Sequence, residues 1–321
     1  MKPTALSENS RDFLNITPIY AFGEAMLETF PFEVGYTITR IVAEIAYRFS
    51  PVHRASMEAN VRQVLSVTQP DLGGAELDRI VRETTHRIFW NRGTAYADNT
   101  VMATRRQLNG RIKYKKMGNW ADNWALIEKV RASGRGVIIA SAHLGNWYSG
   151  GTLLSTQNVP VRSVTYRNTA MDGMVQKLSR RGNIQHTYVD NDPFAMAEIV
   201  RALRHGEVLM TMADVAWDAR TIELPFFGRP AKFPVGPFRL ARLAEVPIFP
   251  AFCTWKRRLD YEATLNDPIE VRGDDPERAE LEAAGRFVAV LEREIAAHLT
   301  QWLNFTPIWG AAPGSVNPVS E

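Results

Sequence analysis

The sequence contains a single cysteine, Cys253, among its 321 residues. One cysteine excludes an internal disulfide and a thiolate metal cage, and it fits a reducing compartment. No apolar run approaches the roughly 18–20 residues that a helix needs to span a bilayer. No hydrophobic stretch follows Lys2, so we expect no secretory signal. The six histidines are scattered, without the spacing typical of metal ligands. We therefore expect a soluble or peripheral protein that needs neither a metal nor another cofactor.

The excess of positive charge is also small, because 38 basic residues face 35 acidic ones and the formal net charge is +3. A balance this mild gives no reason to expect a nucleic-acid partner. It fits anionic lipid head groups or a phosphorylated substrate, and equally a solvated surface with scattered charges. Basic residues do concentrate in residues 105–116. That segment is either a solvated strand or turn, or a patch that docks on anionic lipid.

Helical periodicity dominates the first 130 residues. Apolar residues recur at helical spacing in residues 34–50, 54–67 and 75–96. The first of these helices either packs onto the rest of the chain or lies in a membrane interface. We expect residues 1–130 to form a helical, membrane-proximal N-terminal extension.

From Gly134 onward, short β-rich runs alternate with helical windows. Strands are expected at residues 136–142, 161–166, 184–189 and 208–213, and helices at 146–155, 170–181 and 194–204. This alternation predicts parallel strands joined by right-handed crossovers. A hairpin, a short helix, two strands and a long helix follow, at residues 222–227, 237–244, 248–255, 261–271 and 276–303. The predicted fold class is α/β, with a mostly parallel central sheet flanked by helices in one compact unit, residues 131–321.

Polar side chains stand at the carboxyl ends of the four alternating strands: His143, Arg167, Asp190 and Asp214. Ligands bind beyond the carboxyl ends of strands in open parallel sheets, so we expect these side chains to meet on one rim. His143 is then a candidate general base, and Asp214 the carboxylate that orients its ring. The alternatives are structural. His143 is then a satisfied strand-end residue, Asp214 a turn cap, and Asp190 the cap of the following helix.

The four residues after Leu144 favour an oxyanion site. Gly145 permits a close backbone approach, and Asn146 is a good N-cap for a helix that starts with Trp147 and Tyr148. The N-terminus of that helix directs free N–H groups and a positive dipole toward the rim. We expect backbone N–H groups near residues 145–147 to stabilise a tetrahedral oxyanion.

Basic side chains are candidate partners for further negative charge on a substrate. Arg167 is a candidate second donor to the oxyanion. Together with Arg229 and Lys232, it is also a candidate for binding the phosphates of an acyl carrier or of the acceptor. Arg239 and Arg242, on the short helix at 237–244, either face the acyl donor or only water.

Five segments together resemble one family. They are SAHLGNWYSGG at 141–151, TYRN at 165–168, GEVLMTMAD at 206–214, ELPFFGRPAKFPVGPFRLA at 223–241 and QWLNFTPIW at 301–309. In this order they resemble the lipid A biosynthesis lauroyl/myristoyl acyltransferases and the related phosphatidylinositol mannoside acyltransferases. The resemblance implies a glycerolipid acyltransferase-like fold. It also implies transfer of an acyl group from acyl-ACP or acyl-CoA to a glycolipid hydroxyl, by a peripheral enzyme at the cytoplasmic face of the inner membrane.

One position departs from the pattern of this family. The family places an acid five residues after its histidine, and here Tyr148 stands there. A tyrosine is neutral at pH 7 and does not balance an imidazolium. The resemblance to the mannoside acyltransferases gives that role to a more distant acid, which Asp214 matches. Two alternatives stay open, a catalytically degenerate lipid-binding or scaffold protein of the same fold, and a serine hydrolase that uses Ser141.

Overall fold

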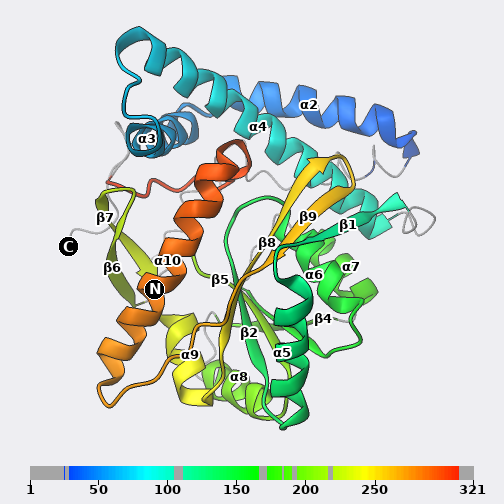
Figure 1. Ribbon diagram of the computed structural model, residues 1–321. Coiled ribbons are helices and arrows are strands. Elements are labelled where there is room, and N and C mark those ends of the chain that lie inside the picture. The colour runs from blue at the N-terminus through cyan, green and yellow to red at the C-terminus, as the bar shows by residue number, and fades with distance from the viewer. Residues whose placement is uncertain are drawn as a thin grey trace, which may run out of the picture.

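The computed structural model describes residues 25, 29–104, 111–165, 172–182, 184–189, 194–215 and 220–310. Seven strands form its central sheet: β1 (Lys113–Met117), β2 (Val137–Ser141), β3 (Val161–Thr165), β4 (Ile184–Tyr188), β5 (Val208–Met212), β8 (Ile248–Arg257) and β9 (Asp260–Leu265). Their order in the sheet is β1-β9-β8-β2-β5-β3-β4 (Figure 1). Neighbours are parallel except for the antiparallel pair β8–β9. The predicted mostly parallel α/β fold is confirmed.

Helices cover both faces of this sheet and one of its ends. They are α2 (Phe32–Phe49), α3 (Pro51–Thr68), α4 (Gly74–Thr104), α5 (Trp120–Ala132), α6 (Trp147–Ser155), α7 (Asp172–Gly182), α8 (Ala195–Arg204), α9 (Gly236–Ala244) and α10 (Pro276–Ala297). Side chains alternate between the faces of β2. Val137 and Ile139 pack with α5 and α6, whereas Ile138 and Ala140 pack with α8, α9 and α10. A separate hairpin, β6 (Thr221–Phe226) and β7 (Arg229–Pro234), packs on α10.

The N-terminal helices lie across the end of the sheet near the β8–β9 turn (Figure 1). α2 and α4 run side by side, and Gly93 permits their close approach, because a Cβ there would lie 2.8 Å from the carbonyl oxygen of Thr39. The sequence predicted that α4 ends near Tyr96. It continues to Thr104 because residues 97–103 are all buried. None of the described helices has both the length and the apolar character that crossing a membrane requires.

Two predicted elements are shorter than expected. The strand predicted at 261–271 ends at Leu265, shortly before Pro268, which has no N–H group for the ladder. The helix predicted at 276–303 ends at Ala297, and a 3₁₀ turn at Leu299–Gln301 then returns the chain to the sheet. Part of the basic segment 105–116 forms β1, which pairs with β9, so a piece of the predicted extension belongs to the central sheet. The division at residue 130 stays a prediction.

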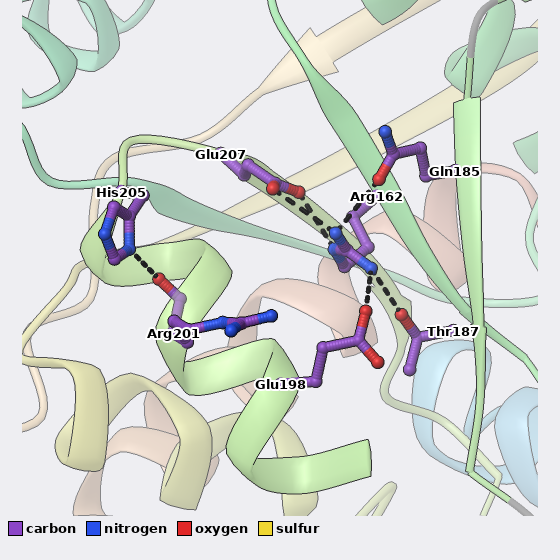
Figure 2. A network of polar contacts seen from close by, with 7 residues as sticks. All are labelled: Arg162, Gln185, Thr187, Glu198, Arg201, His205 and Glu207. Atoms are coloured by element: carbon purple, nitrogen blue, oxygen red, sulfur yellow. Dashed lines mark hydrogen bonds and ion pairs between the residues drawn. The ribbon is translucent and has the colours of Figure 1, made fainter. Parts of the chain in front are cut away.

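A buried polar network holds β3 at the amino-terminal side of the sheet. Figure 2 shows the guanidinium of Arg162, whose residue is 8% exposed, between side chains from β4, α8 and the turn before β5. It donates to Glu207, Glu198 and Thr187, each at 2.8 Å, and to Gln185 at 3.0 Å. The cation is therefore paired with two carboxylates and satisfied on each nitrogen. This network lies at the opposite end of the strands from His143, and its role is in the fold.

Candidate active site

His143 lies just beyond the carboxyl end of β2, a strand in which every residue is buried. Its carbonyl oxygen accepts a hydrogen bond from the N–H of Leu303 at 2.6 Å. Its side chain keeps 24% of its surface exposed. The backbone of His143 is therefore fixed, while its ring is open to a substrate.

Asp214 stands beside His143 because β2 and β5 are adjacent, parallel strands. Ser141 is the register partner of Met212, and the N–H of Ala213 then donates to the carbonyl of Ser141 at 2.8 Å. The Asp214 carboxylate accepts twice from His143: Oδ1 is 2.8 Å from the ring Nδ1, and Oδ2 is 2.9 Å from the backbone N. The Asp214 side chain is only 2% exposed. The expected approach of the two side chains is present, and their catalytic roles stay predictions.

This pairing determines which ring nitrogen of His143 a substrate meets. An ionised carboxylate only accepts hydrogen bonds, so in the neutral imidazole the Nδ1 that faces Asp214 carries the proton and Nε2 has the lone pair. The backbone N–H and the Nδ1–H of His143 both donate to Asp214, and within the described residues Nε2 has no hydrogen-bond partner. If Nε2 takes a proton, the buried carboxylate stabilises the resulting cation. The geometry is that of a general base oriented by an acid.

A short loop joins His143 to α6, and only glycine fits at its centre. Gly145 has a φ of +64°, and a Cβ there would lie 2.2 Å from the carbonyl oxygen of Cys253. The N–H groups of Gly145 and Asn146 donate to the carbonyl oxygens of Gln301 and Cys253, at 2.9 and 2.7 Å. Both N–H groups are therefore occupied and neither is available to an oxyanion. Of the three amides expected to bind the oxyanion, the next one along the chain is left.

That next amide belongs to Trp147, the first residue of α6. Asn146 caps this helix as expected, because its Oδ1 accepts from the N–H of Ser149 at 3.1 Å. The first N–H groups of a helix have no intrahelical acceptor, and the described residues offer the Trp147 N–H no other. The Trp147 ring meets the His143 ring edge-on, with centroids 4.8 Å apart. Trp147 therefore places a helix N-terminus beside the candidate base.

An apolar cavity lies between the sheet and helices α5 and α6. Its empty volume is about 450 Å³, a figure that includes the part open to solvent. Leu153, Leu154 and Met210 contribute to its walls, and Trp147 connects it to His143. Cys253 also lines it, and burial raises the pKa of this thiol to about 12. The thiol is thus a neutral part of the wall rather than a nucleophile.

Comparisons with known proteins identify the family. The model of the bacterial lipid A biosynthesis acyltransferases matches residues 10–310. The chain belongs to this family. The phosphatidylinositol mannoside acyltransferase of Mycobacterium tuberculosis (strain CDC 1551 / Oshkosh) is 24% identical over 188 residues, 57% of each chain. That of Mycolicibacterium smegmatis is 22% identical over 182 residues, 55% of this chain and 58% of the relative. The chain thus spans somewhat more than half the length of the curated relatives it matches.

One part of the site in this lipid A acyltransferase family member was not expected from the sequence. The C-terminal segment reaches both members of the pair, because Asn304 Nδ2 lies 3.4 Å from Asp214 Oδ2 while Leu303 binds the backbone of His143. Asn304 is only 2% exposed. The sequence signal for this contact was the polar side chain of Asn304 between the apolar Leu303 and Phe305, since a buried polar side chain needs a hydrogen-bond partner.

Among the described residues, Tyr148 makes no hydrogen bond to His143 or Asp214. Tyr148 packs, partly buried, against an apolar cluster of α2, α4 and α7 that includes Tyr36 and Val101. It therefore fills space between helices. Arg167 and Asp190 lie outside the described residues, so their roles stay predictions.

The basic candidates beyond residue 220 are also placed. Arg229 and Lys232 are exposed on β7, and within the described chain neither bonds to His143 or Asp214. Their phosphate-binding role stays a prediction. Arg239 and Arg242 pair instead with Glu280, whose side chain is 3% exposed, at 3.3 and 2.9 Å. These two arginines fasten α9 to α10.

Proposed function

We propose that this chain transfers a fatty acyl group from an acyl-ACP or acyl-CoA thioester to a hydroxyl of a glycolipid. The observation that carries the proposal is the 2.8 Å contact between His143 Nδ1 and Asp214 Oδ1, beside an apolar cavity. Membership of the family supports acyl transfer as the reaction class. The names of the mannoside acyltransferases support a glycolipid acceptor, lipid A-like in having sugar hydroxyls.

In the proposed reaction, His143 Nε2 removes the proton of the acceptor hydroxyl as its oxygen attacks the thioester carbonyl carbon. A tetrahedral oxyanion forms, and the Trp147 N–H at the start of α6 donates to it. The intermediate then collapses to the ester and expels the thiolate, which takes the proton from the imidazolium. Asp214 holds the ring in place and offsets its charge throughout. No acyl-enzyme is part of this scheme.

The surroundings of the pair give the remaining parts of the proposal. The cavity beside Trp147 is assigned to the acyl chain, since its walls are apolar and Trp147, which lines it, also contacts the ring of His143. Arg167, Arg229 and Lys232 are assigned to phosphates of the donor or acceptor. The acceptor is a membrane lipid, so we place the reaction at a membrane surface, with the cytoplasmic face of the inner membrane as the expected location.

The test is an acyl-transfer assay with a radiolabelled acyl-CoA and phosphatidylinositol mannoside in mixed micelles. The wild type should yield acylated glycolipid, and His143→Ala should lower kcat by about 10³-fold or more, because the base is lost. His205→Ala, at an exposed histidine on the end of α8, is the matched control and should keep full activity. A folded His143→Ala variant with wild-type turnover would remove the proposed base.

A non-catalytic lipid-binding protein is the second candidate, because Tyr148 occupies the position of the acid in the family pattern. Tyr148→Glu separates the two candidates. Our proposal expects activity to fall, since the substitution puts a carboxylate into an apolar cluster while His143 already has its acid. A large gain of activity would instead show that the site lacks an acid. Ser141 lines the cavity without a hydrogen bond to His143 in the described chain, which gives the hydrolase reading no support.

A further inference from the structure

A buried carboxylate on α4 lies close to the active-site loop but is not part of the dyad. Asp98 is 0% exposed. Its Oδ1 accepts from the hydroxyl of Tyr36, and its Oδ2 accepts from the hydroxyl of Tyr261 at 2.5 Å and from the N–H of Leu259 at 3.4 Å. Three donors from α2, β9 and the turn before it thus converge on one carboxyl group.

The two tyrosines differ in what lies beyond them. The single O–H of Tyr261 is used on Asp98, so the oxygen of Tyr261 is left as an acceptor. Asn146 Nδ2 donates to it at 3.3 Å. The amide oxygen of Asn146 is then free to face α6, where it caps the N–H of Ser149 at 3.1 Å. The chain of hydrogen bonds therefore fixes which way the Asn146 amide points.

We propose that Asp98 is a positioning residue, which acts through Tyr261 and Asn146 to set the first turn of α6. The inference rests on the proposed function, because that turn carries the Trp147 N–H and places the Trp147 ring against that of His143. A second contact supports it: Tyr114 stacks on Tyr261 at 5.6 Å, and its hydroxyl accepts from the Ser149 hydroxyl at 3.0 Å.

The cost of burying Asp98 argues against a role in packing alone. A carboxylate removed from water is unfavourable unless it is fully paired, and an apolar side chain of similar size is often as stable. Burial raises the pKa of Asp98, and the hydrogen bonds from Tyr261 and Tyr36 oppose that rise. One of these two tyrosines, Tyr261, also holds the active-site loop through Asn146, so the network ties the N-terminal helices to the proposed chemistry.

Two conservative variants separate positioning from general stability. Tyr261→Phe and Tyr36→Phe each remove one hydrogen bond to Asp98 from a buried tyrosine, and only Tyr261 also contacts Asn146. Both should lower the melting temperature to a similar extent. Tyr261→Phe should lower kcat about tenfold with KM within about twofold, because the free energy of one aligned hydrogen bond corresponds to about that factor in rate. Tyr36→Phe should keep kcat within about twofold of the wild type.

A third variant tests the route of the effect. Asn146→Ser keeps an N-cap acceptor for α6 and loses the donor to Tyr261. If the effect passes between these two residues, the double variant Tyr261→Phe with Asn146→Ser loses about the same factor in kcat as either single variant. The inference is overturned if the kcat losses of the two single variants multiply in the double variant. It is also overturned if Tyr261→Phe and Tyr36→Phe have the same kcat.

A structural readout keeps this test separate from that of the proposed function. The backbone ¹H–¹⁵N resonance of Trp147 should shift in Tyr261→Phe and stay in place in Tyr36→Phe. If the wild type transfers no acyl group, the proposed function fails while the resonances still decide the positioning. An unmoved Trp147 resonance in Tyr261→Phe contradicts the inference even when the wild type is active.

Discussion

Replacing Asp214 with asparagine tests the proposed pair with almost no change of volume. Oδ2 of Asp214 faces two donors, the backbone N–H of His143 at 2.9 Å and the amide of Asn304 at 3.4 Å. The oxygen of the new amide therefore takes that side, and its NH₂ group faces Nδ1 of His143. As a donor, the NH₂ group moves the ring proton to Nε2. The imidazole is then held in the tautomer that cannot accept a proton from the acceptor hydroxyl.

The size of the effect follows from the distance and the burial of the pair. A charge about 4 Å from the developing imidazolium contributes about 4 kcal/mol at an effective dielectric constant of about 20, which is about 10³-fold in rate. The same substitution in a serine protease triad, where the tautomer is also reversed, lowers kcat about 10⁴-fold. We expect kcat of Asp214→Asn to fall about 10³–10⁴-fold, with KM for the thioester within about threefold.

The assay is steady-state acyl transfer with thermal unfolding measured in parallel. Asp122→Asn, at an exposed carboxylate on α5, is the matched control for the change of charge and should keep wild-type kcat. A folded Asp214→Asn variant whose kcat lies within tenfold of the wild type would refute both the orientation argument and the assignment of Asp214.

Gly145→Ala should lower the free energy of unfolding by at least about 2 kcal/mol more than Gly118→Ala and abolish acyl transfer, because both glycines have positive φ but only Gly145 is crowded by backbone. Equal losses in urea unfolding would contradict this. Arg162→Met should lower the free energy of unfolding by about 1–3 kcal/mol, since it leaves the buried Thr187 hydroxyl and two partly exposed carboxylates without their guanidinium partner, and should keep kcat within about twofold of the wild type at a temperature where it is folded. Arg278→Met, at an exposed pair, should change neither quantity measurably. Cys253 should resist a disulfide reagent between pH 7 and 9 in the native chain, because burial raises its pKa to about 12, whereas labelling of the unfolded chain should accelerate over the same range. Stoichiometric labelling of folded protein within minutes would show that the thiol is accessible.

The strand order could be anticipated from the sequence only in part. Alternating apolar runs and helical windows predict parallel strands, and the carboxyl-end rule brings His143 and Asp214 to one rim. Adjacency of β2 and β5 is a tertiary fact, since β3 and β4 intervene in the chain. Asp98 was hidden for the same reason: its partners Tyr36 and Tyr261 lie 62 and 163 residues away.

The predicted ends of two helices were wrong because tertiary contacts override the local periodicity of the sequence. Gly93 is a residue that weakens helices, yet α4 continues through it because the missing side chain permits contact with α2. The periodic pattern of α10 suggested a helix to residue 303, but the chain leaves it at Ala297 so that Leu303 and Asn304 can reach the pair. Such a break depends on partners about 90 residues or more distant in sequence, which periodicity does not record.

The position of the acid determines which contacts are needed to fix helix α6. An acid five residues after the histidine would lie on α6 itself, and its charge would tie that helix to the base. Here Asp214 belongs to the strand end of β5, so the pair forms within the sheet and gives α6 no such tie. The helix is instead held by the cap of Asn146 and its bond to Tyr261. In the proposed scheme, an acid on the sheet therefore orients the base without orienting the oxyanion donor. The orientation of the donor is the role that we assign to the buried Asp98.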